Sequence, residues 1–538
     1  MSFDVVIKDG KVIDGTGNPW FKADVGIEDG IVTDVGNLRS AAAELTINAS
    51  GLVVCPGFID VHTHSDFTWL LNPKADSFLR QGVTTEVIGN CGFSVAPVRD
   101  AKKELMVKTI FGYKPGLVEI DWHTLGEYLN RLEKTGLANN VAPLVGHGTI
   151  RIAVMGYDNR LATKEELQEM KILTHQSMKD GALGISYGGY APCSYADTNE
   201  LIELCKVVAA YGGIFATHVR RTDPIEAYKE AIEIGEKAGV PVQILHLAAT
   251  GYKDVPSEKV LELVESARKK DVDVTCDIHG YLWGVAPLSY LIPYWVHEGG
   301  VKKMLERLRD LNVREKIKKE IKEVKPIDSI TYIMRNSQWD KIKLHRSEKS
   351  KGLVGKTFAE IANLQNLDPV DAMFEFLLTE GEDLNNVYIL IENYRQEDVN
   401  NVFKHNTSMI GSDGLVLAPY GDLSMIKWHP RSYGTFPRIF RRYVREEKLL
   451  TIEEAIRKMT SFPAQRIKLK NRGLIKEGMI ADIVVFDPEE IEDRATYEEE
   501  AQYPVGIEYI LVNGTLALDK GEFTGKLAGK PLRLREFI

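Results

Sequence analysis

The chain has 538 residues, of which 44% are hydrophobic and 27% charged, and its formal net charge is −10. This length predicts one large barrel or two to three domains, and the acidic balance argues against nucleic acid as a partner. No apolar run approaches the roughly 18–20 residues of a membrane span, so we expect no membrane partner. Five cysteines without a CxxC pair indicate a reducing compartment. A cytoplasmic protein is expected.

Both ends of the chain are predicted to be β-rich. In residues 1–54, the pairs Asp9-Gly10 and Asp29-Gly30 separate apolar stretches and predict hairpin turns. Asn513-Gly514 predicts another turn near the other end. We therefore predict that residues 1–54 and 472–538 pair into one small β-sandwich domain.

Between these ends, short apolar runs alternate with longer helical segments, which indicates βα units around a parallel sheet. Eight runs are recognised: 57–64, 84–91, 142–148, 182–188, 213–219, 242–248, 272–278 and 407–413. Eight is the strand count of a (β/α)8 TIM barrel, whose active site lies at the carboxyl ends of the strands. The α/β fold class is therefore predicted, with residues 55–471 forming the barrel.

The stretch between the seventh and eighth runs is far longer than one helix needs. We interpret residues 285–385 as an inserted, lid-like subdomain, because long insertions at the top of a barrel commonly form a substrate wall. A purely structural excursion is the alternative.

Six residues that can ligate a metal close these apolar runs: His62, His64, Cys91, His218, His246 and Asp413. His62 and His64 are two apart, so both point to one face of their strand. Each has an ordinary explanation as well: a satisfied core histidine, a small buried cysteine or a helix-capping aspartate. Together, imidazole, thiolate and carboxylate at the ends of five strands favour a zinc site.

The motifs GFIDVHTHSD, QGVTTEVIGNCGFSVAP, VGHGTIR, HPRSYGTFPR and GLIKEGMIADIVVFD resemble the amidohydrolase superfamily. Within it the chain resembles the N-acyl-D-amino-acid deacylase (D-aminoacylase) branch over nearly its whole length. The resemblance implies a (β/α)8 barrel with a small β-sandwich. It also implies a zinc-dependent hydrolase that cleaves a linear amide of a small molecule, with N-acyl-D-amino acids as the expected substrates.

The resemblance further implies roles for particular residues. Cys91, His218 and His246 would hold one tight zinc, and His62, His64 and Asp413 a possible second, weaker one. Asp413 would act as general base and then general acid. Arg431 would bind the substrate carboxylate, and Tyr281 and Tyr190 would contact substrate. We interpret His147, which closes the third run, as a residue that orients substrate or a metal ligand.

The chain departs from the branch at Ala248, where the family has a lysine that helps to bind the substrate carboxylate. Two alternatives stay open: a cyclic-amide hydrolase of the hydantoinase or dihydroorotase kind, and a catalytically inactive structural relative. The absence of a lysine from the fourth run and the presence of Cys91 argue against the first. The intact ligand set argues against the second. A homo-oligomer is left open.

Overall fold

The structure is a computed structural model that describes residues 2–107, 109, 116–220, 223–247, 255–323, 329–382 and 387–534. Within these ranges, eight parallel strand positions form a barrel and match the eight predicted runs. They are β6 (Phe58–Asp60), β7 (Val83–Ile88), β8 (Asn140–Pro143) with β9 (Val145–Gly146), β10 (Gly184–Tyr187), β11 (Ile214–Thr217), β12 (Val242–Ile244), β13 (Val274–Ile278) and β17 (Ser408–Ile410). The predicted barrel is confirmed, although all its strands except β13 end earlier than the runs suggested.

The barrel closes between its first and last strands, just beyond the assigned ends of β6 and β17. Thr63 forms a parallel bridge with Gly414. The Asp413 amide donates to the His62 carbonyl at 2.7 Å, and the His64 amide donates to the Gly414 carbonyl at 2.8 Å. This seam brings the first and the last candidate ligands side by side.

Helices surround the barrel strands: α3 (Leu125–Thr135), α4 (His147–Met155), α5 (Lys164–Asp180), α6 (Thr198–Ala210), α7 (Pro224–Ala238), α8 (Ser257–Arg268), α14 (Gln396–Lys404), α16 (Ile452–Met459) and α17 (Ser461–Arg466). Local sequence fixes several of their ends. Thr163 forms a capping box with Glu166 at the start of α5, which satisfies two otherwise unpaired amides. Asp223 caps α7, and Gly239 ends it in the left-handed conformation.

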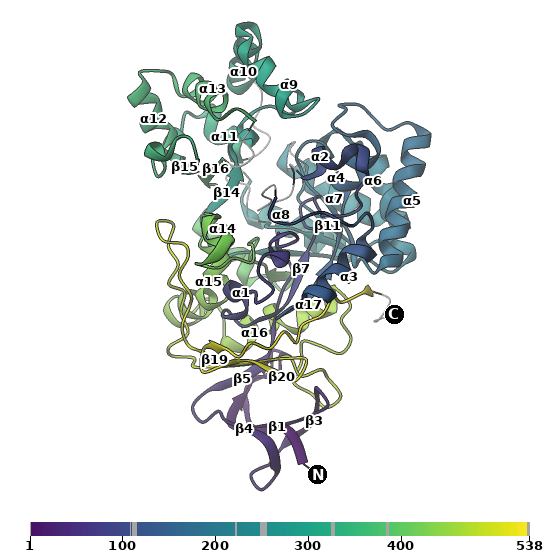
Figure 1. Cartoon of the computed structure of the whole chain (residues 1–538), viewed down its shortest axis with the longest axis vertical. Coiled ribbons are helices and arrows are strands. Elements are labelled where there is room, and N and C mark those ends of the chain that lie inside the picture. The colour runs from purple at the N-terminus through teal and green to yellow at the C-terminus, as the bar shows by residue number, and fades with distance from the viewer. Residues whose placement is uncertain are drawn as a thin grey trace.

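The two ends of the chain join in a single sheet at one end of the molecule (Figure 1). Among the described residues this sheet has nine strands: β1 (Ser2–Val12), β2 (Phe21–Glu28), β3 (Ile31–Gly36), β4 (Ala42–Asn48), β5 (Val53–Pro56), β18 (Ile483–Phe486), β19 (Ile507–Val512), β20 (Thr515–Asp519) and β21 (Glu522–Phe523). β5 pairs antiparallel with β18, and this pairing joins the two halves around a small apolar core.

Two of the three predicted hairpins are confirmed, and the third prediction is wrong. Asp29-Gly30 connects β2 to β3, and Asn513-Gly514 connects β19 to β20. β1 instead runs straight through Asp9-Gly10, where the register with β2 shifts between Ile7 and Gly10. Asp9 has a φ of 60°, so the pair forms a bulge within a long strand, because the same left-handed geometry serves bulges and turns.

An insertion lies at the opposite end of the molecule (Figure 1). It contains an antiparallel sheet of β14 (Trp283–Pro287), β16 (Tyr388–Glu392) and β15 (Ile342–Arg346). Its helices are α9 (Val301–Arg309), α10 (Leu311–Glu323), α11 (Ser329–Arg335), α12 (Phe358–Gln365) and α13 (Pro369–Glu380). These elements share an apolar cluster of their own, built around Leu308, Phe374 and Ile389. The strands extend slightly beyond the predicted 285–385, and the domain boundaries stay predictions.

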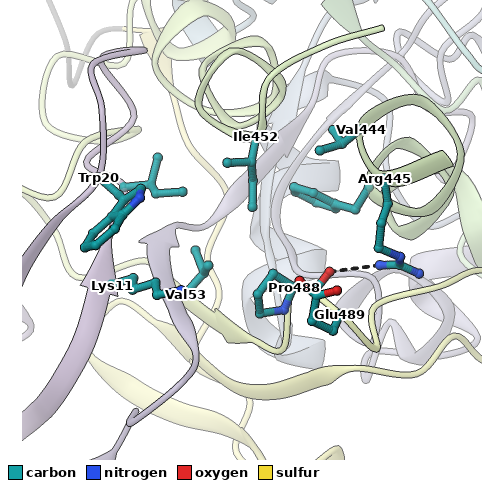
Figure 2. A pocket seen from close by; sticks show the side chains of 10 residues that line it. Lys11, Trp20, Val53, Val444, Arg445, Ile452, Pro488 and Glu489 are labelled. Carbon is teal, nitrogen blue, oxygen red and sulfur yellow. Dashed lines mark hydrogen bonds between the residues drawn. The ribbon is translucent and has the colours of Figure 1, made fainter. Parts of the chain in front are cut away.

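A small cleft of about 250 Å³ lies where the terminal sheet meets the barrel (Figure 2). Trp20 and Lys11 stand on one side of it, and Val444 and Arg445 on the other. Its lining includes none of the residues predicted to bind metal or substrate. No helix in the described ranges is long and apolar enough to cross a membrane.

Candidate metal centre

The structure brings all six predicted ligands together at the carboxyl end of the barrel. His62 and His64 follow β6, Cys91 follows β7, His218 follows β11, His246 follows β12, and Asp413 follows β17. Three overlapping groups of these residues have ligand atoms within 4.8 Å of one another. The side chains converge because parallel barrel strands deliver their last residues to one rim.

The first group contains Cys91, His218 and His246. The Cys91 Sγ lies 3.8 Å from His246 Nε2, and His218 Nδ1 lies 2.9 Å from His246 Nε2. Cys91 reaches this position from a tight loop. A Cβ at Gly188 would lie 2.1 Å from the Cys91 carbonyl oxygen, so only glycine lets the loop after β10 approach so closely.

The second group contains His62, His246 and Asp413, and the third contains His62, His64 and Cys91. Asp413 also lies against His64. Its Oδ1 lies 2.9 Å from His64 Nε2 and 3.5 Å from His62 Nε2. The His62 Nε2 is also 3.4 Å from the Cys91 Sγ. His62 and Cys91 therefore place these groups next to each other, in an arrangement that could hold two neighbouring cations.

Three of the six candidate ligands have a left-handed backbone. The φ angles are 50° at Cys91, 36° at His246 and 54° at Asp413. This conformation costs free energy for any residue with a Cβ and is concentrated at functional sites. These three residues lie where the strand ends turn into loops, and their ligand atoms belong to the groups described above.

Sequence reasoning missed Asp277, which contacts two of the candidate ligands, His62 and His246. This residue is 1% exposed, and its Oδ1 lies 3.2 Å from His62 Nδ1 and accepts the His246 amide at 2.9 Å. An acceptor at Nδ1 fixes the tautomer of His62 and directs its Nε2 toward the other ligands. The available signal was position, since Asp277 stands next to last in the seventh predicted run.

The electrostatics of the site favour the charged forms of its thiol and carboxylate. Burial alone would raise the pKa of Cys91, but the charge of His62 and hydrogen bonds from His218 and His246 hold it well below its ordinary value. Burial likewise would raise the pKa of Asp413, and the neighbouring Arg431 and His62 lower it far more. A thiolate and an ionised carboxylate are the forms that ligate metals.

Arg431 and Tyr281, both predicted to bind substrate, lie beside this centre. The Arg431 Nη1 lies 2.9 Å from Asp413 Oδ2 and 3.4 Å from His279 Nε2. The Tyr281 amide in turn approaches His279 Nδ1 at 3.3 Å, so His279 stands between the two residues. Sequence reasoning assigned His279 no role. The Arg431 Nε and the Tyr281 hydroxyl are buried and have no hydrogen-bond partner among the described residues.

Tyr190 and His147 have different surroundings. The Tyr190 ring lies 4.9 Å from the His218 ring and stacks on Tyr290 of the insertion at 3.8 Å. His147 is the first residue of α4 and is fully buried, and its Nε2 lies 2.8 Å from Glu200 Oε1. Both substrate-contact assignments stay predictions. Ala248 lies outside the described residues.

The donor set fits zinc. Atoms that ligate a tetrahedral zinc are separated by about 3.3–3.6 Å. In the group of Cys91, His218 and His246, the Cys91 Sγ lies 3.8 Å from His246 Nε2 and the His218 Nδ1 lies 2.9 Å from it, so small side-chain shifts would bring the three atoms to these separations. Nitrogen and sulfur donors suit zinc better than calcium or magnesium, which prefer oxygen. The fourth strand, β10, has the sequence GISY and carries no lysine that could bridge two metals.

Comparison with known proteins agrees with this fold. The amidohydrolase family matches residues 45–282 and 323–517 of the chain. The chain therefore belongs to the amidohydrolase family, which combines a TIM barrel with a β-sandwich domain.

Within that family the chain belongs to the D-aminoacylase branch of N-acyl-D-amino-acid deacylases. It is 34% identical to the D-aminoacylase of Alcaligenes xylosoxydans xylosoxydans, over 98% of this chain and 97% of that protein. The N-acyl-D-aspartate deacylase of the same organism is 33% identical, over 97% of this chain and 93% of the relative.

Solved structures of this branch also resemble the chain. The N-acyl-D-glutamate deacylase of Bordetella bronchiseptica, complexed with zinc and a phosphonate mimic of the tetrahedral intermediate, has a TM-score of 0.80 and 29% identity, and the match covers 99% of this chain and 100% of that one. A structure from work on the binuclear metal centre of D-aminoacylase has a TM-score of 0.79 and 31% identity, with the same coverage.

Proposed function

We propose that the protein is a zinc-dependent hydrolase that cleaves the linear amide bond of N-acyl-D-amino acids. The observation that carries the proposal is the convergence of Cys91, His218 and His246 beside an ionised Asp413 that is paired with Arg431. A zinc ion held by the first three residues would supply a Lewis acid and a bound water with a pKa near 7. His62 and His64, with Asp413, would form a second and weaker site.

Each of the other predicted site residues would then have its own role in the reaction. Asp413 accepts a proton from the attacking water and passes it to the leaving nitrogen, because an amine anion is a very poor leaving group. Its low pKa keeps the carboxylate unprotonated at neutral pH, which is the form that can accept a proton. Arg431 holds the substrate carboxylate with its guanidinium, and the Tyr281 hydroxyl donates to substrate from the adjacent wall. Tyr190 lines the pocket next to His218.

The direct test is a panel of N-formyl, N-acetyl and N-carbamoyl D- and L-amino acids, together with cyclic imides and hydantoins, assayed on zinc-loaded protein. We expect hydrolysis of acyl-D-amino acids. Turnover of the cyclic compounds alone would identify a hydantoinase-like or dihydroorotase-like activity and overturn the proposal. Zinc-loaded protein that turns over nothing would point to an inactive relative.

Cys91→Ala tests the proposed metal site independently of any substrate. We expect bound zinc to fall to less than about a tenth of the wild-type content under matched dialysis, because the tight site loses its thiolate. Metal content is measured by elemental analysis. Cys205→Ala is the matched control, since Cys205 is a buried thiol on the outer helix α6. Unchanged zinc in Cys91→Ala would make Cys91 a packing residue.

A further inference from the structure

The irregular segment 487–506 connects β18 to β19, and we call it the strap. In Figure 1 it is the yellow loop that rises from the terminal sheet beside α15 (Arg431–Arg438). Its two ends are pinned together. The Asp487 amide donates to the Gly506 carbonyl at 2.8 Å, and Glu492 pairs with Val505 through an antiparallel bridge. The terminal domain therefore extends a closed loop toward the catalytic end of the barrel.

Arginines on one helical face hold the strap. Arg438 ends α15, and Arg441 and Arg445 lie on η10 (Ile439–Glu446), a π-helical continuation of it. The Arg445 Nη1 donates to the Pro488 carbonyl at 2.9 Å, the contact dashed in Figure 2. Asp493 is the centre of the arrangement, with a side chain only 3% exposed. Its Oδ2 lies 2.9 Å from Arg438 Nη1, and its Oδ1 lies 2.7 Å from Arg441 Nε.

Arg438 also contacts Tyr281, which is predicted to bind substrate. Its guanidinium carbon lies 4.6 Å from the centre of the Tyr281 ring, and its Nε donates to the Gly280 carbonyl at 2.9 Å. One guanidinium therefore binds Asp493, the backbone next to Tyr281 and the face of the Tyr281 ring. Arg441 shares Asp493 but bonds to Glu446 on its other side, at 2.9 Å.

Asp493 and Tyr281 both pack closely against α15. A Cβ at Gly434, within α15, would lie 2.8 Å from the Asp493 Cβ and 3.0 Å from the Tyr281 hydroxyl oxygen. The strap also approaches Tyr281 through Tyr497. The Tyr497 ring lies 5.2 Å from His429 and 6.4 Å from Tyr281, and the Trp283 amide points to the Tyr497 hydroxyl at 3.4 Å.

We propose that Asp493, a residue of the terminal β-sandwich domain, is a positioning residue that fixes Tyr281 for substrate binding through Arg438. A buried carboxylate that fastens a guanidinium removes its rotational freedom, and the guanidinium then holds the aromatic ring by its face. The role in substrate binding rests on the proposed deacylase function. The coupling from Asp493 through Arg438 to Tyr281 does not depend on that function.

The coupling is tested first without any substrate. The protein is labelled with 3-fluorotyrosine, and the Tyr281 resonance is identified by its loss in Tyr281→Phe. We expect Asp493→Asn and Arg438→Gln to move this fluorine resonance, and Arg441→Gln to leave it nearly in place. The control Glu492→Gln changes a partly exposed strap carboxylate that pairs with Arg494, and no shift is expected there.

Kinetics on the best acyl-D-amino acid of the panel test the consequence for binding. We expect Asp493→Asn and Arg438→Gln each to raise KM roughly tenfold with a much smaller change in kcat, as for the loss of one charge-assisted hydrogen bond. In a Tyr281→Phe background the same substitutions should change KM by less than roughly twofold, because coupled residues are not additive.

Two results would overturn the proposal. One is a Tyr281 resonance and a KM that stay at wild-type values in Arg438→Gln. The other is equal effects of Arg438→Gln and Arg441→Gln, which would reduce Asp493 to a general anchor of the strap. The comparison of Arg438→Gln with Arg441→Gln tests the proposal even if Asp493→Asn does not fold. If wild-type protein hydrolyses no compound of the panel, the proposed function fails while the fluorine spectra still judge the coupling.

Discussion

Three side chains that can carry positive charge surround Asp413. His62, His64 and Arg431 all lie within 3.5 Å of its carboxylate oxygens. A carboxylate in such a setting stays ionised, and its position next to the thiolate group suits proton transfer at the reacting centre.

Asp413→Asn is expected to lower kcat by about 10²–10⁴-fold, the usual contribution of a general acid–base group. Zinc bound by Cys91, His218 and His246 should remain. The measurement is steady-state kinetics together with metal content. Asp422→Asn, the same change at an exposed position, serves as the control. A kcat within a few fold of wild type would remove Asp413 from the proton-transfer role.

Glu200 is a second buried carboxylate, away from the metal centre. Burial would raise its pKa, but hydrogen bonding to His147 and the charge of Arg151 lower it to about 2 from 4.5. Arg151 Nη1 lies 2.6 Å from Glu200 Oε2. Because the folded-state pKa is depressed, the ionised carboxylate stabilises the fold above about pH 4.5. That stability is lost as the pH falls toward 2.

Glu200→Gln is expected to destabilise the protein by about 3–5 kcal/mol at pH 7, because Arg151 stays buried without its charge partner. The difference from wild type should narrow as the pH falls from about 4.5 toward 2. Urea unfolding followed by circular dichroism at several pH values measures both effects. A difference that is constant with pH would contradict the assignment of the low pKa to Glu200.

The candidate ligands could be predicted from sequence because residue type and position point the same way. His62, Cys91 and Asp413 each combine a metal-binding side chain with the end of an apolar run. Asp277 also stands near the end of an apolar run, but only the fold shows that it supports His62 and that His279, which follows the run, touches Arg431. The left-handed backbone at Cys91 was equally hidden, because no local signal such as glycine requires it.

At the scale of elements, the eight barrel strands were predictable as apolar runs between helical patterns, while two details were not. Asp9-Gly10 has the composition of a hairpin, yet β1 continues because it pairs on both sides, with β2 and with β4. The π-helical continuation of α15 was also unforeseen. Its arginines make long-range contacts with the strap, and periodicity in the sequence does not report such contacts.

Gly434→Ala tests the close packing of α15. Alanine favours helix, but the added methyl would meet the Asp493 Cβ at 2.8 Å, so we expect a net destabilisation of about 1–3 kcal/mol from overpacking. KM should rise as Tyr281 is displaced. Thermal unfolding and steady-state kinetics measure the two effects. Gly352→Ala is the control, because its Cβ would meet nothing within 4 Å. A variant as stable as wild type would show that the contact relaxes easily.

At the scale of the whole molecule, the barrel and the insertion have separate apolar cores. The sequence indicated an insertion by the length of the segment between two barrel strands. It did not predict the sheet of β14, β15 and β16, because these strands pair across long stretches of chain. Separate cores allow the insertion to loosen while the barrel and its metal centre stay folded.

Phe374→Ala is expected to destabilise the insertion by about 3–5 kcal/mol, because Phe374 is fully buried in its core. Amide hydrogen exchange followed by mass spectrometry should show faster exchange in the insertion strands and helices, with the barrel strands unchanged. Leu364→Ala, at a side chain that is 64% exposed, should change neither. Faster exchange throughout the barrel would show that the two cores unfold together.

The pairing of β5 with β18 has a consequence for the biosynthesis of the chain. Val53 is made early by the ribosome, and its partner Phe486 emerges only after the whole barrel and the insertion have been translated. Until then β5 has an open edge, and open edges of apolar strands invite association between nascent chains. Expression with added chaperones that shield such edges should therefore raise the yield of folded protein.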